Sequence, residues 1–163
     1  MTDDRLSGSA TDRQGPTDVR FALTTGRKAD IPQGRVAVFS SDTRYNQNVI
    51  KHGTGVDLLV HEVASARPEL MKEAYVQRII GHHTVPRDAG RVFAQTRPKL
   101  AAYTHIVQVA SERIPPPTID DIVAETRQTY DGPLVVGEDL MAFDIGDTVS
   151  VRRYQTPSRL PQS

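Results

Sequence analysis

Side chains that bind divalent metals or transfer protons recur in this sequence at the ends of its apolar segments. They are Asp42 after segment 35–40 (RVAVFS), His61 and Glu62 after segment 57–60 (DLLV), His82 and His83 after an amphipathic segment that ends near residue 80, and His105 after segment 99–104 (KLAAYT). In folds of alternating strands and helices, functional side chains gather where strands end and loops begin. An imidazole or carboxylate at the edge of apolar sequence is costly to leave unpaired. The sequence therefore predicts a metal or proton-transfer site built from these segment ends.

Each of these residues also has a simpler interpretation. A single histidine can be a hydrogen-bonded structural residue, and Asp42 can be a turn aspartate or the N-cap of a helix. Four of the five histidines recur at the same kind of position, and this recurrence favours a site. His52, in a glycine-rich turn, lacks that context. His82 and His83 are neighbours, so their side chains are expected to point apart.

Composition limits the classes of protein and of site. The chain has 163 residues with 20 basic and 20 acidic side chains, so no overall field draws it to nucleic acid or to a membrane surface. It has no cysteine, so any metal must be bound by His, Asp or Glu. Residues 1–15 contain no secretory apolar core, and no run approaches the roughly 20 apolar residues of a membrane span. A cytoplasmic location is therefore expected.

The elements that must position these residues follow from the apolar pattern. The polar segments 1–17 and 156–163 are predicted to be a disordered arm and tail, which leaves 18–155 as the domain. Strands are predicted at 19–23, 35–40, 57–63, 99–106, 134–137, 140–145 and 148–153. Helices are predicted at 46–51, from Pro68 to about residue 80, from Pro86 onward, and from a capping box of Thr118 and Asp121 to Gly132, the last burying Ile119, Ile122, Val123 and Tyr130. This alternation predicts an α/β domain, but it does not separate a doubly wound sheet from half of a sandwich.

Three segments share an order of motifs with one family. Segment 40–64 contains Ser-Asp-Thr, a short helix and a strand with His-Glu at its end, segment 82–106 contains a His-Thr loop, a helix and a strand ending in Thr-His, and segment 133–145 is a closing hairpin. In this order and spacing the segments resemble metallo-β-lactamase-fold hydrolases of the ribonuclease Z and arylsulfatase-like groups. The resemblance covers residues 35–146. It implies that the α/β fold is the C-terminal half of an αββα sandwich.

The resemblance also implies roles for single residues. Asp42 matches the aspartate that bridges two metal ions, and His105 matches the last histidine ligand. Glu62 and His83 match a pair whose members hydrogen-bond to each other and deliver a proton to the leaving oxygen. The complete family site holds two divalent ions, zinc or manganese, and hydrolyses phosphodiesters or related esters. Ser41 stands where the family usually has glycine, which makes the backbone path of this loop a point to check.

One part of the family's site is missing from this sequence. Family members carry a His-x-His-x-Asp-His cluster in their first half, whereas this sequence has no histidine before His52. Asp42 and His105 alone are two ligands, and zinc usually has four. Metal binding by this chain alone is therefore expected to be weak or absent, with His61 and His82 as the conceivable substitutes.

Three functions are compatible with these observations. The first is a partial domain of a metal-dependent hydrolase, which implies an RNA or a small ester or phosphodiester as substrate. The second is a non-catalytic remnant that binds a partner or a metal, and the third is an α/β ligand-binding module with structural histidines. Half of a sandwich exposes an apolar sheet face, so a homodimer or a complementary N-terminal half is the expected partner, and no membrane.

Overall fold

A computed structural model of the chain describes residues 19–23 and 34–154, with the backbone alone described for 19–23. The predicted arm and tail, residues 1–17 and 156–163, lie outside the described residues, and the limits of the predicted domain therefore stay a prediction. Across the described part of the chain, no helix combines the length and the apolar character that crossing a membrane requires.

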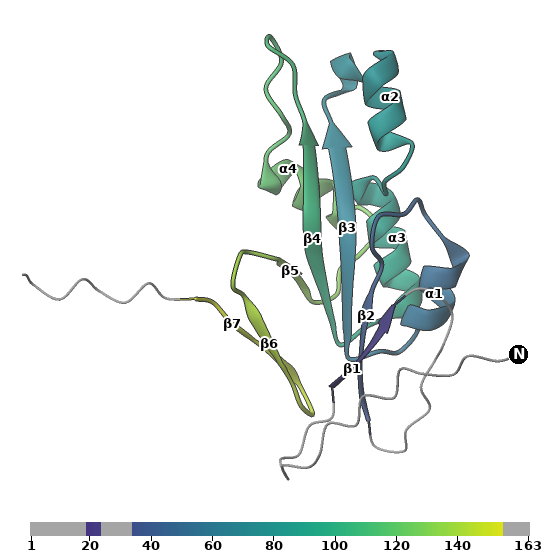
Figure 1. Ribbon diagram of the computed structural model, residues 1–163, viewed down its shortest axis with the longest axis vertical. Helices are drawn as coiled ribbons and strands as arrows, with labels where there is room; N and C mark the ends of the chain where they lie inside the picture. Colours follow the sequence, from purple (N-terminus) through teal and green to yellow (C-terminus); the bar gives the residue numbers. More distant parts are fainter. Residues whose placement is uncertain (1–18, 24–33, 155–163) are drawn as a thin grey trace, which may run out of the picture.

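A parallel sheet of five strands forms the centre of the domain (Figure 1). Its strands lie side by side in chain order: β1 (Val19–Leu23), β2 (Arg35–Phe39), β3 (Leu58–Ala66), β4 (Leu100–Val109) and β5 (Leu134–Val136). Parallel strands are usually covered on both faces, which explains why β2, β3 and β4 are continuous apolar runs and not alternating ones. The predicted α/β class is confirmed, and the strands lie where the apolar runs predict them.

The two faces of the sheet have different coverings. One face packs against α1 (Gln47–Gly53), α3 (Pro86–Thr96) and α4 (Ile119–Arg127), and its core includes Leu59, Val63, Phe93 and Ile122. The other face carries Leu58, Val60 and Ala102, and it packs against the antiparallel hairpin of β6 (Ala142–Ile145) and β7 (Val149–Arg152). Because side chains alternate along a strand, neighbouring residues of β3 enter different layers. The expected apolar face is therefore not left bare, since the β6–β7 hairpin covers part of it. The closing hairpin predicted over residues 133–145 is wrong, because β5 joins the parallel sheet beside β4 and β6 pairs with β7 instead.

Strands β3 and β4 are the longest strands, and their ends form a small core of their own with α2 (Ala74–Ile80) (Figure 1). The sequence pattern predicts one helix from Pro68 to about residue 80, and this prediction is wrong. The structure has a 3₁₀ turn, η1 (Pro68–Leu70), followed by α2, with Glu73 in extended conformation between them. Leu70 and Val76 both pack in this core. Six residues apart on one α-helix they would point about 120° from each other, so the break lets both reach the same core.

Helices α1 and α4 begin at side-chain caps. The predicted capping box is confirmed: the Asp121 N–H donates to Thr118 Oγ1 (3.1 Å) and the Thr118 N–H donates to Asp121 Oδ2 (2.8 Å). Asn46 is the N-cap of α1, so Asp42 is not a helix cap.

Two further predictions for α4 are wrong, since the helix ends at Arg127 instead of Gly132 and Ile119 is 37% exposed. The helix packs closely against α3 near its C-terminal end, where a Cβ on Gly90 of α3 would lie 2.6 Å from the carbonyl oxygen of Thr126. Ile119, at the opposite end, is left outside the core.

Candidate functional site

Asp42, His83 and His105 meet at one edge of the sheet, although they come from three separate segments of the chain. Asp42 follows β2, His83 follows α2, and His105 lies within β4. The distance from His105 Nε2 to Asp42 Oδ1 is 3.5 Å, and one ligand atom from each of the three residues lies within 4.8 Å of the others. The rings of His83 and His105 are 5.5 Å apart between centroids. The structure thus brings together the predicted ligands and the predicted proton donor.

The loop that holds Asp42 begins with an unusual backbone conformation. Ser41 has a φ of 54°, in the left-handed region that glycine adopts without cost. The neighbouring Ser40 is buried, and its N–H donates to the carbonyl oxygen of Val60 (3.0 Å) while its hydroxyl donates to that of Ser41 (2.8 Å). Ser41 therefore adopts the left-handed backbone conformation that glycine, the usual residue of the family at this position, would adopt without strain. Asp42 is thereby directed toward β4.

His105 reaches the site because β4 bulges at this residue. Glu62 pairs with Thr104 and Val63 pairs with Ile106, so His105 has no partner on β3. Its φ of 43° is again left-handed, which is strained for a residue with a Cβ. A β-bulge turns a side chain away from the direction that strict alternation would give it. Here the bulge leaves the imidazole exposed beside Asp42 and not in the sheet core.

A hydrogen bond to the buried Glu62 carboxylate holds the His83 ring in place. The Glu62 side chain is fully buried, and its Oε2 accepts a hydrogen bond from His83 Nδ1 (2.8 Å) while its Oε1 accepts one from the Thr84 N–H (2.7 Å). Burial raises the pKa of the Glu62 carboxyl, and the hydrogen bonds from Thr84 and His83 oppose that rise. With Nδ1 occupied, the remaining ring nitrogen of His83, Nε2, is available for chemistry.

Thr84 fixes the loop that carries His83, and the sequence reasoning gave it no role. Its hydroxyl donates to the carbonyl oxygen of Thr43 (2.7 Å), and its own carbonyl oxygen accepts from the Ala64 N–H (3.0 Å). Together with its bond to Glu62, this ties the loop to both β3 and the Asp42 loop. The feature of the sequence that could have indicated this role is a threonine directly after two histidines.

The other histidines do not join this cluster. His61 is buried on the helix-covered face, where its ring meets Phe93 edge-on at 5.9 Å between centroids. Its Nδ1 lies 2.6 Å from the carbonyl oxygen of Glu62, and burial lowers its pKa to about 4. His82 is exposed beside the site, and His52 lies in α1, away from the strand ends. His61 therefore serves the core, and the expectation that it could substitute as a ligand is not supported.

A pocket of about 460 Å³ opens directly beside His105. Phe39, Val60 and Phe143 of the hairpin-covered face line it, together with the carboxylates of Glu138 and Asp139. The pocket has room for an organic group of a ligand bound beside His105.

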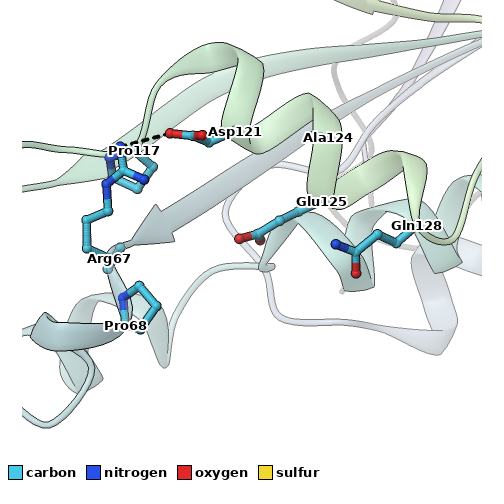
Figure 2. A pocket seen from close by; sticks show the side chains of 8 residues that line it. Arg67, Pro68, Pro117, Asp121, Ala124, Glu125 and Gln128 are labelled. Atoms are coloured by element: carbon cyan, nitrogen blue, oxygen red, sulfur yellow. Dashed lines mark ion pairs between the residues drawn. The ribbon is translucent and has the colours of Figure 1, made fainter.

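A second pocket, of about 290 Å³, lies where β3 ends near α4 (Figure 2). Arg67 reaches across it to Asp121, with an Nη2–Oδ2 distance of 2.9 Å. Glu125 and Gln128 line it from α4. None of the four predicted site residues lines this pocket, and its arginine is already paired with Asp121. The edge of the sheet that holds Asp42, His83 and His105 (the site edge) is therefore the better candidate.

The chain is similar to curated proteins named Ribonuclease Z, while no protein-family model matches it. It is 30% identical to that of Brevibacillus brevis over 128 residues (78% of this chain and 36% of the relative) and 34% identical to that of Haloarcula marismortui over 110 residues (66% and 32%). For that of Haloferax volcanii the identity is 28% over 140 residues (85% and 40%). These similarities confirm the resemblance to ribonuclease Z. The chain spans between 32% and 40% of the length of these relatives.

Among solved structures, the chain is similar to the metallo-beta-lactamase fold protein YhfI from Bacillus subtilis. The sequence identity is 18% and the TM-score is 0.46, and the match covers 63% of this chain and 36% of that one.

Proposed function

We propose that this chain is the C-terminal part of a metal-dependent hydrolase of the metallo-β-lactamase fold that acts on phosphodiesters, as the name of its ribonuclease Z relatives suggests. The observation that carries the proposal is the hydrogen bond between Glu62 and His83 beside the Asp42–His105 pair. The pair places a histidine whose ring is held by a buried carboxylate directly beside both predicted metal ligands. A hydrolase requires both metal ligands and a proton donor for the leaving group.

The donor set fits the metals that the family implies. Imidazole and carboxylate are ligands for zinc and manganese, and Asp42 and His105 would be the ligands that this chain contributes. Divalent ions bound there would lower the pKa of a bound water and offset negative charge that develops on the substrate. RNA, or a small phosphodiester or ester, is the proposed substrate class.

The residues of this chain would orient the substrate and move the proton. Glu62 accepts from His83 Nδ1 and thereby fixes the orientation of the ring. His83, in its imidazolium form, would donate a proton from Nε2 to the leaving oxygen, while Glu62 stabilises the positive charge of the ring. The pocket beside His105 would receive the adjoining part of the substrate.

The complete two-metal site of the family needs more ligands than residues 1–163 supply. The His-x-His-x-Asp-His cluster of the family is absent from this sequence. We propose a complementary N-terminal half as the partner, because a homodimer would double Asp42 and His105 without recreating that cluster. A second copy or a different protein covering the pocket face would instead indicate the non-catalytic alternative.

Complementation tests this proposal directly. The N-terminal segment of the Brevibacillus brevis relative, ending where the similarity to this chain begins, is mixed with the full chain in zinc or manganese, and hydrolysis of a bis-aryl phosphate and of RNA is measured. We expect hydrolysis that neither part shows alone, lost in Asp42→Ala and in Glu62→Gln and kept in His52→Ala. Association without hydrolysis would favour the non-catalytic remnant, and equal activity of Asp42→Ala would contradict the proposed site.

A further inference from the structure

We infer that this chain by itself binds one divalent metal ion through Asp42, His83 and His105, with His83 Nε2 as the third ligand. The inference rests on the proposed function for the metal-binding role of Asp42 and His105, but it requires no second half. It also gives His83 a role other than proton delivery. In the absence of the other ligands, the ring that would donate a proton becomes the one that completes the metal site.

The distances allow three ligands around one ion. One ligand atom from each of the three residues lies within 4.8 Å of the others, and His105 Nε2 is 3.5 Å from Asp42 Oδ1. In a tetrahedral zinc site with bonds of 2.0–2.1 Å, neighbouring ligand atoms are ~3.3 Å apart. The separation between Asp42 and His105 is therefore already close to that value. Only His83 and this pair need to approach each other.

The three side chains differ in how freely they can move. The side chains of Asp42 and His105 are 59% and 53% exposed, whereas that of His83 is 11% exposed. His83 is also fixed by Glu62, whose other oxygen is fixed by Thr84. The half-buried ring, held by Glu62, therefore provides a rigid ligand, and rotations of the two exposed side chains would close the site around an ion.

Glu62 gives His83 the environment of a metal ligand. A histidine that binds a metal usually donates its second ring N–H to a carboxylate, which orients the ring and makes the ligating nitrogen more basic. The bond from His83 Nδ1 to Glu62 Oε2 has this form and leaves Nε2 as the ligating atom. The same pair therefore suits ligation here as well as proton delivery in a complete enzyme.

Backbone strain at the two exposed ligands is an independent observation. Ser41, next to Asp42, and His105 itself are both left-handed residues with a Cβ. Strain of this kind persists where the surrounding structure enforces it, and it concentrates at functional sites. Relaxing either residue would redirect Asp42 or His105, so both strained residues serve the convergence of the ligands.

Two imidazoles and one carboxylate, with a fourth position open to water, form a ligand set of the kind that zinc occupies in catalytic sites. No thiolate is available, because the sequence has no cysteine. We therefore assign the site to zinc, with cobalt(II) as a spectroscopic substitute.

The test uses the full chain and zinc alone. Isothermal titration calorimetry should give a stoichiometry of one zinc ion per chain. In NMR spectra, zinc should shift the signals of the ring nitrogens of His83 and His105 but not those of His61. We expect each of Asp42→Ala, His83→Ala and His105→Ala to weaken binding by more than 100-fold, and Glu62→Gln to weaken it by about 10-fold, as for other residues that orient a ligand. His82→Ala, which removes an exposed neighbouring histidine, is the matched control and should bind as the wild type does.

Several outcomes would overturn the inference. They are zinc binding unaffected by His83→Ala, an unmoved His83 nitrogen signal in the wild type, and half an ion per chain, which would indicate a site shared between two copies. The NMR measurement needs no variant, so a variant that fails to fold does not block the test.

The inference and the proposed function can fail separately. Zinc binding that requires His83, with no hydrolysis after complementation, would leave only the inference standing. Hydrolysis after complementation without zinc binding by the chain alone would leave only the proposed function.

Discussion

The helix-covered face of the sheet and the site edge are built by opposite rules. On the helix-covered face, Phe93, Tyr103 and Ile122 are almost completely buried, and the Tyr103 hydroxyl is paired with Thr126 Oγ1 at 2.7 Å. At the site edge, Asp42 and His105 are exposed, and the backbone includes two left-handed residues with a Cβ. Burial and close packing stabilise the first region. In the second, strained backbone conformations that cost free energy bring polar side chains together. Substitutions should therefore separate stability from function along this division.

Strand β3 connects the two regions through a pair of neighbouring residues. His61 points to Phe93 on the helix-covered face, and Glu62 reaches His83 at the site. Both side chains are completely buried, but only Glu62 has a role in the proposed chemistry. Adjacent polar residues of one motif thus serve different parts of the molecule because a strand alternates its side chains.

The largest effect is expected from truncating the centre of the helix-covered core. Phe93→Ala removes a fully buried ring that packs against Tyr103 and Tyr130, so we expect a loss of ~3–5 kcal/mol in the free energy of unfolding. Tyr154→Ala, which truncates an exposed aromatic residue, should stay within about 0.5 kcal/mol of the wild type. Urea denaturation followed by circular dichroism measures both. Similar losses in the two variants would contradict the role of Phe93 in stabilising the helix-covered core.

The pH dependence of stability should report His61. Its pKa is about 4 in the folded chain against 6.5 when unperturbed, so the unfolded chain binds a proton that the folded chain does not as the pH falls from 6.5 toward 4. The free energy of unfolding should fall by ~3 kcal/mol across this window from His61 alone. Glu62, with its raised pKa, acts in the opposite direction because its folded form takes up a proton first as the pH falls.

The contribution of His61 is obtained by difference. His61→Asn keeps a donor near the Glu62 carbonyl oxygen and removes the titrating ring, so its stability should depend less steeply on pH between 6.5 and 4. Denaturation curves of the wild type and the variant at several pH values measure this difference. Parallel pH profiles would show that burial of His61 does not control acid stability.

The smallest effect should come from relieving strain at the site. His105→Gly and His105→Ala both remove the imidazole, but glycine tolerates a φ of 43° and alanine does not. We expect the glycine variant to be more stable than the alanine variant by ~1 kcal/mol. At the adjacent Thr104, which is not left-handed, the order should be reversed, with glycine the less stable. An alanine variant as stable as the glycine variant at residue 105 would mean that the bulge relaxes without cost.

Local sequence was sufficient for most of the elements. The β-branched runs predicted the strands, and the cap at Thr118 and the proline at residue 86, the first residue of α3, predicted the starts of two helices. Segment 68–80 was mispredicted, because its break depends on packing Leu70 and Val76 against β4, which local helical periodicity does not contain. Ile119 was mispredicted for a related reason, since the place where α4 meets α3 is set by Gly90.

The candidate site divides in the same way. The sequence by itself determined which residue types stand at the strand ends, and its motif order pointed to ribonuclease Z, because these features are local and ordered along the chain. Only the tertiary structure decided that His61 serves the core, that Thr84 secures Glu62, and that His83 lies near enough to Asp42 and His105 to be a third ligand. The reason is physical: the bulge at His105 and the left-handed turn at Ser41 depend on how neighbouring strands pair, and strand pairing joins residues that are far apart in the sequence.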